Sequence, residues 1–124
     1  MRQRLRKSEI LRDRQLIRRI LNSGERLDGS VLTFIFLRQD AREGMGPKAL
    51  VAFPIRRSQF NSVRRNRCRR LMREAYRRLR DHPDDGTADR TYLLVYPRRD
   101  LKSVPPFKEV YLDIQTAMQR IVKQ

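Results

Sequence analysis

Residues 61–80, NSVRRNRCRRLMREAYRRLR, are the stretch that decides the fold. Apolar side chains recur in it every three or four residues, which is the spacing of a helix face that packs against a core. Asn61 or Ser62 can cap the amino end, because a side-chain oxygen there accepts a backbone N–H of the first turn. The stretch therefore predicts a long helix whose buried stripe is Cys68, Leu71, Met72, Ala75, Tyr76 and Leu79.

Strand-like segments precede this helix. Residues 31–37 (VLTFIFL) and 49–55 (ALVAFPI) are rich in β-branched and aromatic side chains, which favour extended backbone. The polar segment 38–47 between them holds two glycines and a proline and is typical of a hairpin loop. Residues 24–29 are a candidate for a short additional strand.

Further elements lie on either side. Asp13 can cap a first helix that ends before Gly24, although a start at Ser8 fits the sequence equally well. Residues 91–96 are nearly all apolar and predict a strand, and residues 107–121 carry the apolar stripe of a final helix.

These elements predict a single small domain over residues 1–124, with 1–12 as a basic N-terminal arm. The order is α-β-β-β-α-β-α, and the fold class is an α+β or α/β sandwich with one mixed sheet packed by helices. A chain of 124 residues is long enough to bury roughly two-thirds of the surface that its unfolded form exposes.

Charge is concentrated in two segments of the chain. The net charge is +16, from 30 basic and 14 acidic residues. Residues 1–26 hold a net +6 and residues 56–80 a net +10, so the remainder balances at zero. Arginine supplies 25 of the 30 basic residues, and its planar fork matches phosphate and stacks on bases. The composition therefore favours a nucleic acid as the partner.

Several functional classes are excluded by composition. No apolar run approaches the roughly 20 residues of a membrane span, and the basic N-terminus lacks a signal peptide's apolar stretch, which predicts a cytoplasmic protein. One cysteine, Cys68, and one histidine, His82, cannot build a disulfide framework or a zinc site. We expect neither catalytic residues nor a metal site in the protein itself.

The arginines of residues 61–80 outnumber the acids nine to one. Glu74 alone cannot neutralise them by pairing along the helix. Arginines in the first turn also lie at the positive end of the helix dipole, where each cation costs about 0.3–1 kcal/mol. A bound phosphate reverses this cost. The helix therefore favours a nucleic-acid surface over a merely solvated face.

An ordered motif lies within this helix. Arg65-Asn66-Arg67 is followed by Arg69-Arg70 and by REAYRR at 73–78. This order resembles the signature of the bacterial ribonuclease P protein subunit. Further similarities to that family are the basic residues 4–7, Gly24 at the end of the first helix, and Ile55-Arg56-Arg57 before the long helix.

The resemblance implies a left-handed β-α-β crossover, a fold shared with the second domain of a small-subunit ribosomal protein. It implies the accessory subunit of an endoribonuclease, a hydrolase that removes the 5′ leader of precursor tRNA, with the chemistry done by RNA. The implied partners are the catalytic RNA, at one copy each, and precursor tRNA, without membrane or DNA. The protein alone is expected to bind no cofactor, whereas Mg²⁺ is expected with the RNA.

The resemblance also implies two RNA-binding surfaces. The first, for the catalytic RNA, consists of Arg64, Arg65, Asn66, Arg67, Arg69, Arg70, Arg73 and Arg77. The second is a cleft between the first helix and the sheet that takes the single-stranded leader, and its expected residues are Ile17, Leu21, Phe34, Phe36, Phe53, Arg56 and Arg57.

The leader cleft departs from the family's pattern at the first helix. That helix commonly carries aromatic residues, whereas this chain has Ile17 and Leu21. Stacking on an aromatic ring contributes roughly 1–3 kcal/mol per base. Phe34, Phe36 and Phe53 could supply it if they face the cleft, but the sequence leaves open whether the first two face core or RNA.

Two other functions are open on the sequence. A small ribosomal or other structural RNA-binding protein without an enzymatic partner would have the same charge. A DNA-binding regulator is disfavoured, because two strand-like segments precede the basic helix where a helix-turn-helix needs a helix.

Overall fold

The structure is a computed structural model that describes residues 10–40, 49–79 and 89–123. Within these ranges the elements follow the predicted order α-β-β-β-α-β-α. None of the helices in this described part is long and apolar enough to cross a membrane. In chain order the elements are α1 (Arg14–Ser23), β1 (Glu25–Asp28), β2 (Leu32–Asp40), β3 (Ala49–Ala52), α2 (Ser62–Leu79), β4 (Asp89–Pro97) and α3 (Phe107–Lys123).

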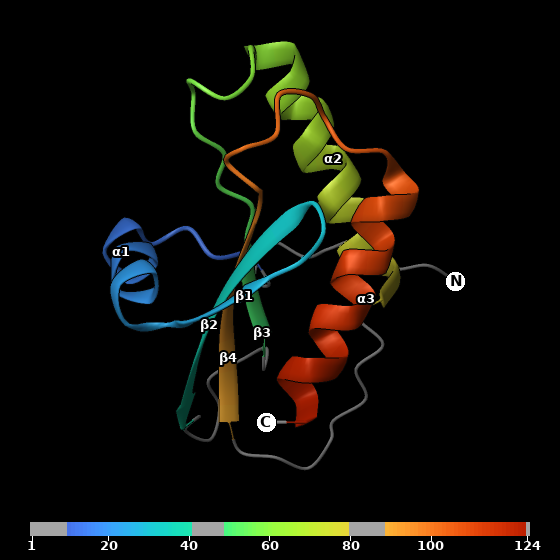
Figure 1. The fold of residues 1–124 in the computed structure, drawn as a ribbon. Helices are drawn as coiled ribbons and strands as arrows, with labels where there is room; N and C mark the ends of the chain where they lie inside the picture. Colours follow the sequence, from blue (N-terminus) through green and yellow to red (C-terminus); the bar gives the residue numbers. More distant parts are fainter. Residues whose placement is uncertain (1–9, 41–48, 80–88, 124) are drawn as a thin grey trace.

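The strands form one sheet in the order β1-β2-β4-β3. β2 pairs antiparallel with β1 and β4, whereas β3 runs parallel to β4. The sheet is therefore mixed, as predicted, and α2 connects its two parallel strands. Figure 1 shows α1 on one side of the sheet and α2 with α3 on the other. The molecule has three layers.

Both faces of the central strands are buried, because helices cover each of them. Phe34 and Phe36 of β2 face α2 and α3, whereas Ile35 between them faces α1. The larger core, on the α2–α3 side, includes Leu93, Val95, Met72, Val110 and Ile114. The smaller core, on the α1 side, includes Leu11, Ile20, Tyr92, Leu94 and Tyr96.

Helix α1 begins directly after Asp13. The Asp13 Oδ1 atom accepts the backbone N–H of Gln15 at 3.0 Å, which is the predicted cap. The alternative start at Ser8 is wrong, because residues 10–13 are not helical. Leu11 instead donates its N–H to the carbonyl of Val51 at 2.8 Å. The described end of the basic arm therefore lies along β3.

Gly24 ends α1, as predicted, for a steric reason. Its φ is −76°, a conformation that any residue can adopt. A Cβ atom at Gly24 would lie 2.6 Å from the carbonyl oxygen of Ile20 and 2.9 Å from that of Phe36. The chain therefore turns into β1 so closely against α1 and β2 that no side chain fits.

The strands differ in length from the predicted segments. β2 and β4 pair along nine residues, from Leu32 opposite Pro97 to Asp40 opposite Asp89. β3 ends at Ala52 and not at Ile55, and Pro54, which follows it, has no N–H to donate to a ladder.

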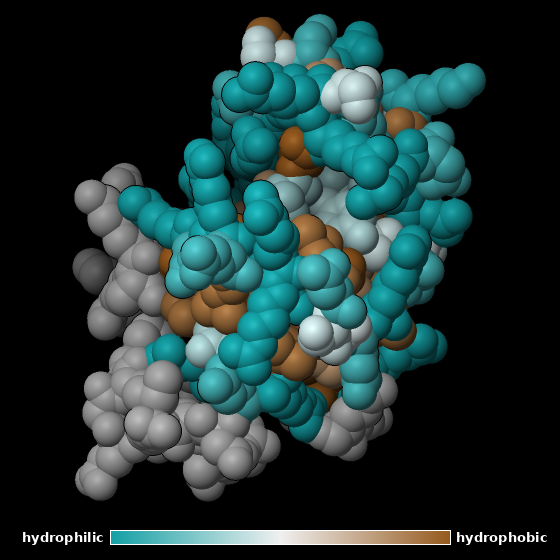
Figure 2. Space-filling model, turned by 90° about the vertical axis from the view of Figure 1, so that its left-hand side faces the viewer, coloured by the Kyte–Doolittle hydropathy of each residue, from teal (hydrophilic) through white to brown (hydrophobic). Residues whose placement is uncertain are grey.

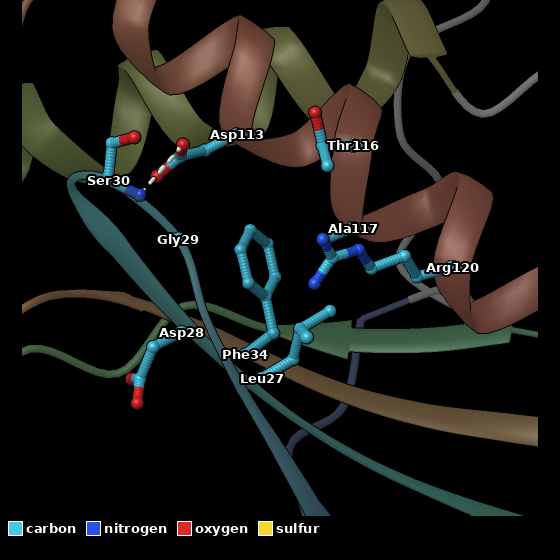
Figure 3. Close-up of a pocket in the computed structure, with 9 residues that line it drawn as sticks. All are labelled: Leu27, Asp28, Gly29, Ser30, Phe34, Asp113, Thr116, Ala117 and Arg120. Carbon is cyan, nitrogen blue, oxygen red and sulfur yellow. Dashed lines mark hydrogen bonds between the residues drawn. The ribbon is translucent and has the colours of Figure 1, made fainter.

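A buried carboxylate joins α3 to the turn between β1 and β2. Asp113 accepts the backbone N–H groups of Ser30 at 3.0 Å, Val31 at 2.7 Å and Leu32 at 2.9 Å. A Cβ at Gly29 would lie 2.5 Å from the Asp113 Oδ2 atom. Figure 3 shows the hydrogen bond between Ser30 and Asp113 at the end of a pocket of about 300 Å³ between β1 and α3. Sequence reasoning did not single out Asp113.

Candidate nucleic-acid interface

Helix α2 has the predicted buried and exposed faces, except that Leu71 and Leu79 of the expected stripe are only half-buried. Cys68, Met72, Ala75 and Tyr76 are buried on the sheet side. The Asn61 Oδ1 atom accepts the backbone N–H of Arg64 at 2.9 Å, so the cap is Asn61 and not Ser62. The helix is thus fixed by its apolar face, and its arginine-rich face is directed outward.

Part of the predicted RNA-binding set is exposed and unpaired. Asn66, Arg70 and Arg73 recur at four and three residues and share one face of α2, with Arg67 beside them. Arg64 lies three residues before Arg67, which is about one turn nearer the amino end of α2. None of these side chains has a hydrogen bond or ion pair within the described residues. We call these five exposed and unpaired residues, Arg64, Asn66, Arg67, Arg70 and Arg73, the α2 stripe.

Two other arginines of the predicted set bind the protein's own backbone. The Arg65 Nη1 atom donates to the carbonyls of Arg57 at 3.0 Å and Phe60 at 2.8 Å. The Arg69 Nε atom donates to the carbonyl of Phe53 at 3.2 Å. Both side chains are half-buried. They are not equivalent to the α2 stripe, although the motif places them beside it.

Arg77 is paired with the single acid of the helix. Its Nε atom donates to Glu74 at 3.1 Å, and the Arg78 Nε atom donates to the same carboxylate at 2.9 Å. Hydrogen bonds from Arg77, with a further contribution from Arg78, lower the pKa of Glu74 from 4.5 to about 2. Arg78 also lies over the ring of Phe107, 5.2 Å from its centroid. Glu74 thus pairs with two arginines at the carboxyl end of α2, but its single charge does not neutralise the helix, as expected.

The expected leader cleft lies on the α1 face of the sheet. Ile17 is half-buried against the smaller core, and Leu21 is 42% exposed. Arg56 and Arg57 are exposed, and their side chains have no partner within the described residues. Figure 2 looks on to this side: brown apolar atoms gather near its centre, and teal side chains surround them. Apolar surface and hydrophilic side chains thus lie together on this face.

The three phenylalanines expected at the leader cleft lie elsewhere. Phe34, Phe36 and Phe53 are all buried, with Phe34 only 1% exposed, in the core on the α2–α3 side. The Phe53 ring meets that of Tyr76 edge-on at 6.2 Å. Their proposed stacking on the leader is therefore wrong. Alternation along β2 turns Phe34 and Phe36 toward α2 and α3, and Phe53, which follows β3, packs in the same core.

Aromatic residues that sequence reasoning missed lie on the α1 face. Tyr92 and Tyr96 of β4 share this face with Leu94, and they are 5% and 9% exposed. Alternation within residues 91–96 groups these three side chains. It does not say which face they take, because both faces of β4 are apolar.

A second group of arginines was also missed. Arg98 and Arg99 line a pocket of about 290 Å³ with Arg26 from β1. Asp28 pairs with Arg26 at 3.2 Å, and Asp100 pairs with Arg98 at 3.2 Å. Arg99 is exposed and has no partner within the described residues. The pocket therefore brings Arg26 of the first basic segment beside Arg98 and Arg99, with two of the three arginines paired to acids.

Cys68 and possible metal ligands are the remaining candidate groups. Burial raises the pKa of the Cys68 thiol to about 11, so it stays protonated within the core. Across residues 10–40, 49–79 and 89–123, no three His, Cys, Asp or Glu side chains are grouped to hold a metal ion. His82 and the basic residues 4–7 lie outside the described residues.

Comparisons with known proteins bear on the fold and the family of this chain. The family model described as Ribonuclease P matches residues 5–122. The ribonuclease P protein component of Chlorobium phaeobacteroides is 39% identical over 75 residues, which cover 59% of this chain and 51% of that protein. The chain thus spans about half the length of this relative.

Solved structures of the same kind share the fold. The RNase P protein of Staphylococcus aureus superposes with a TM-score of 0.69 at 12% identity, covering 93% of this chain and 96% of that one. The RNase P protein of Thermotoga maritima superposes with a TM-score of 0.64 at 24% identity, covering 96% and 97%. The likeness extends over all three layers of the fold.

Proposed function

Because this chain belongs to the ribonuclease P protein family, we propose that it is the protein subunit of a ribonucleoprotein endoribonuclease. In this assembly a catalytic RNA hydrolyses the bond that joins the 5′ leader to precursor tRNA, with Mg²⁺ held by the RNA. The protein binds one copy of the catalytic RNA in the cytoplasm and contributes no catalytic group. The observation that supports this proposal most is the unpaired α2 stripe within the family-like motif.

The α2 stripe suits a phosphate backbone. Its four arginines carry four positive charges, and no acid among the described residues is paired with them. Arg64 and Arg67 lie near the amino end of α2, where backbone N–H groups also favour an anion. Phosphates bound there release counterions, which gives an affinity that falls steeply with salt.

The α1 face suits a single strand. Arg56 and Arg57 can bind phosphates of the leader, while Ile17 and Leu21 offer apolar surface to its bases. Tyr92 and Tyr96 lie in the floor and expose only a small part of each ring. Stacking on them is therefore limited, and we expect a leader contact carried more by phosphates than by bases. Holding the leader in register lowers the entropic part of the cleavage barrier.

The decisive experiment adds the protein to catalytic ribonuclease P RNA at low Mg²⁺ and follows release of the leader from precursor tRNA. We expect leader release to become faster, and half-maximal activity to need less Mg²⁺. Removing two stripe charges with Arg67→Gln and Arg70→Gln should raise the protein concentration needed by about tenfold.

The matched control is the pair Lys108→Gln and Arg120→Gln, which removes two exposed charges from α3. It should leave stimulation unchanged. If the protein binds catalytic and unrelated RNA equally and stimulates nothing, the subunit role is wrong and a structural RNA-binding protein is the better description.

A further inference from the structure

Residues 53–60 connect β3 to α2 and carry the two exposed arginines of the expected leader surface. Phe53, Ile55 and Phe60 are buried, whereas Arg56 and Arg57 are exposed. The segment has neither helical nor strand hydrogen bonding. Within it, the Gln59 N–H donates to the Arg56 carbonyl at 3.1 Å, which closes a turn. The rest of its course depends on contacts with other parts of the chain, since loops without such contacts take many conformations.

Those contacts come from the arginine motif itself. Arg65 bridges the carbonyls of Arg57 and Phe60, and Arg69 binds the carbonyl of Phe53. Arg65 and Arg69 are four residues apart, so one side of α2 holds both ends of the segment. Hydrogen bonds from a charged donor are stronger than neutral ones.

The segment is also anchored on its other side. The Gln59 Nε2 atom donates to the carbonyls of Arg98 at 2.7 Å and Leu101 at 3.2 Å. Figure 1 shows residues 53–60 and the connection from β4 to α3 rising side by side from the sheet. The segment is thus held between α2 and this connection.

We propose that Arg65 and Arg69 are positioning residues, which act on RNA through segment 53–60 and not by binding phosphate. They fix the direction of Arg56 and Arg57 relative to the α2 stripe, and so set the spacing between the two RNA surfaces. A segment ordered before RNA arrives loses less conformational entropy on binding. The step that involves RNA rests on the proposed function above.

The first test needs no RNA and uses hydrogen–deuterium exchange of the free protein. Arg65→Gln and Arg69→Gln should each speed deuterium uptake in residues 54–61 by about tenfold, since a charge-assisted hydrogen bond is lost. Arg67→Gln and Arg70→Gln are the controls. Each removes one positive charge from the same helix, but these two side chains bind no backbone carbonyl among the described residues, so deuterium uptake in residues 54–61 should not change.

A variant that loosens the whole fold would show the same gain in β2 and β4. If this happens, deuterium uptake is measured on Arg65→Lys in place of Arg65→Gln. Lysine keeps the charge and most of the side-chain stem, but it lacks the planar fork that bridges the two carbonyls. Uptake confined to residues 54–61 supports the proposal. Unchanged uptake there in both Arg65→Gln and Arg69→Gln overturns it.

The second test is a double-mutant cycle on the affinity of the assembled ribonucleoprotein for precursor tRNA. Arg65→Gln should weaken binding about fivefold in the otherwise unaltered protein, and less than twofold when Arg56→Gln and Arg57→Gln are already present. Arg67→Gln should weaken the affinity for precursor tRNA by one and the same factor, whether or not Arg56→Gln and Arg57→Gln are present.

Arg65→Gln could instead weaken tRNA binding equally with and without Arg56→Gln and Arg57→Gln. That result would mean that Arg65 binds RNA directly, and it would overturn the proposal that Arg65 acts on RNA through segment 53–60. If the unaltered protein binds neither catalytic RNA nor precursor tRNA, the proposed function fails. The exchange experiment still decides, independently, whether Arg65 and Arg69 hold the segment.

Discussion

Asp113→Ala removes the carboxylate that joins α3 to the turn between β1 and β2. Three backbone N–H groups lose their acceptor, and those of Val31 and Leu32 are buried. The third, on Ser30, is part-buried and can be hydrated. A buried donor without a partner costs about 1–3 kcal/mol, so two of them cost roughly 2–6 kcal/mol. We expect a loss of about 4 kcal/mol, which is a large part of a small domain's stability.

Urea unfolding followed by circular dichroism measures this loss, and the slope m shows whether the transition stays two-state. Asp100→Ala is the matched control, because Asp100 is an exposed carboxylate paired with Arg98 alone. It should cost less than about 1 kcal/mol.

Gly29→Ala probes the same contact from the opposite side. The added Cβ would meet the Asp113 Oδ2 atom at 2.5 Å, so it should destabilise the protein by about 1–3 kcal/mol, and by less once Asp113 is alanine. A loss below 1 kcal/mol for Asp113→Ala would refute the assigned role of the carboxylate.

Three further predictions concern the helices. Arg67→Gln with Arg70→Gln should make the slope of log affinity for catalytic RNA against log salt shallower by about 1.5, measured by filter binding from low to moderate salt. Glu74 has a folded pKa of about 2 against 4.5, so its stabilising contribution is complete above pH 4.5 and disappears as pH falls toward 2; Glu74→Gln should remove this part of the acid sensitivity in unfolding titrations. Gly24→Ala should lower stability by about 1–3 kcal/mol in urea, because its Cβ would meet two carbonyl oxygens within 3 Å.

Each of these has an outcome that would contradict it. Arg65→Gln is the comparison for salt dependence, and an equal flattening by that variant would mean that Arg65 also binds phosphate. An acid profile unchanged by Glu74→Gln would mean that its pairing with Arg77 adds nothing to folding. A neutral Gly24→Ala would mean that β1 can move away from α1.

Local patterns in the sequence predicted what local contacts determine. The cap at Asp13 and the buried face of α2 depend on residues within a few positions of each other, and both are as expected. Phe34 and Phe36 were correctly placed on one face of a strand. Their side of the sheet could not be assigned, because helices cover both faces and residues 34–37 of β2 are apolar on both faces.

Contacts between distant parts of the chain could not be predicted from the sequence. Asp113 binds backbone N–H groups 81 to 83 positions away, and nothing in a helical stripe marks such a carboxylate. The motif in α2 identified Arg65 and Arg69 as important. It did not distinguish them from Arg67 and Arg70, because their partners are carbonyls on a segment whose course only the fold defines.

The pairing of Glu74 has a consequence for how a polyanion meets α2. Residues 62–70 hold five arginines and no acid, whereas residues 71–79 hold three arginines and Glu74, and two of those three are bound to it. The helix is therefore a rod with a charge gradient along its axis, and this gradient points the same way as the helix dipole. Such a rod exerts a torque on an approaching nucleic acid, turning its densest phosphates toward the amino end before any specific contact forms. The single acid of the helix thereby gives the encounter a polarity that a uniformly basic helix lacks.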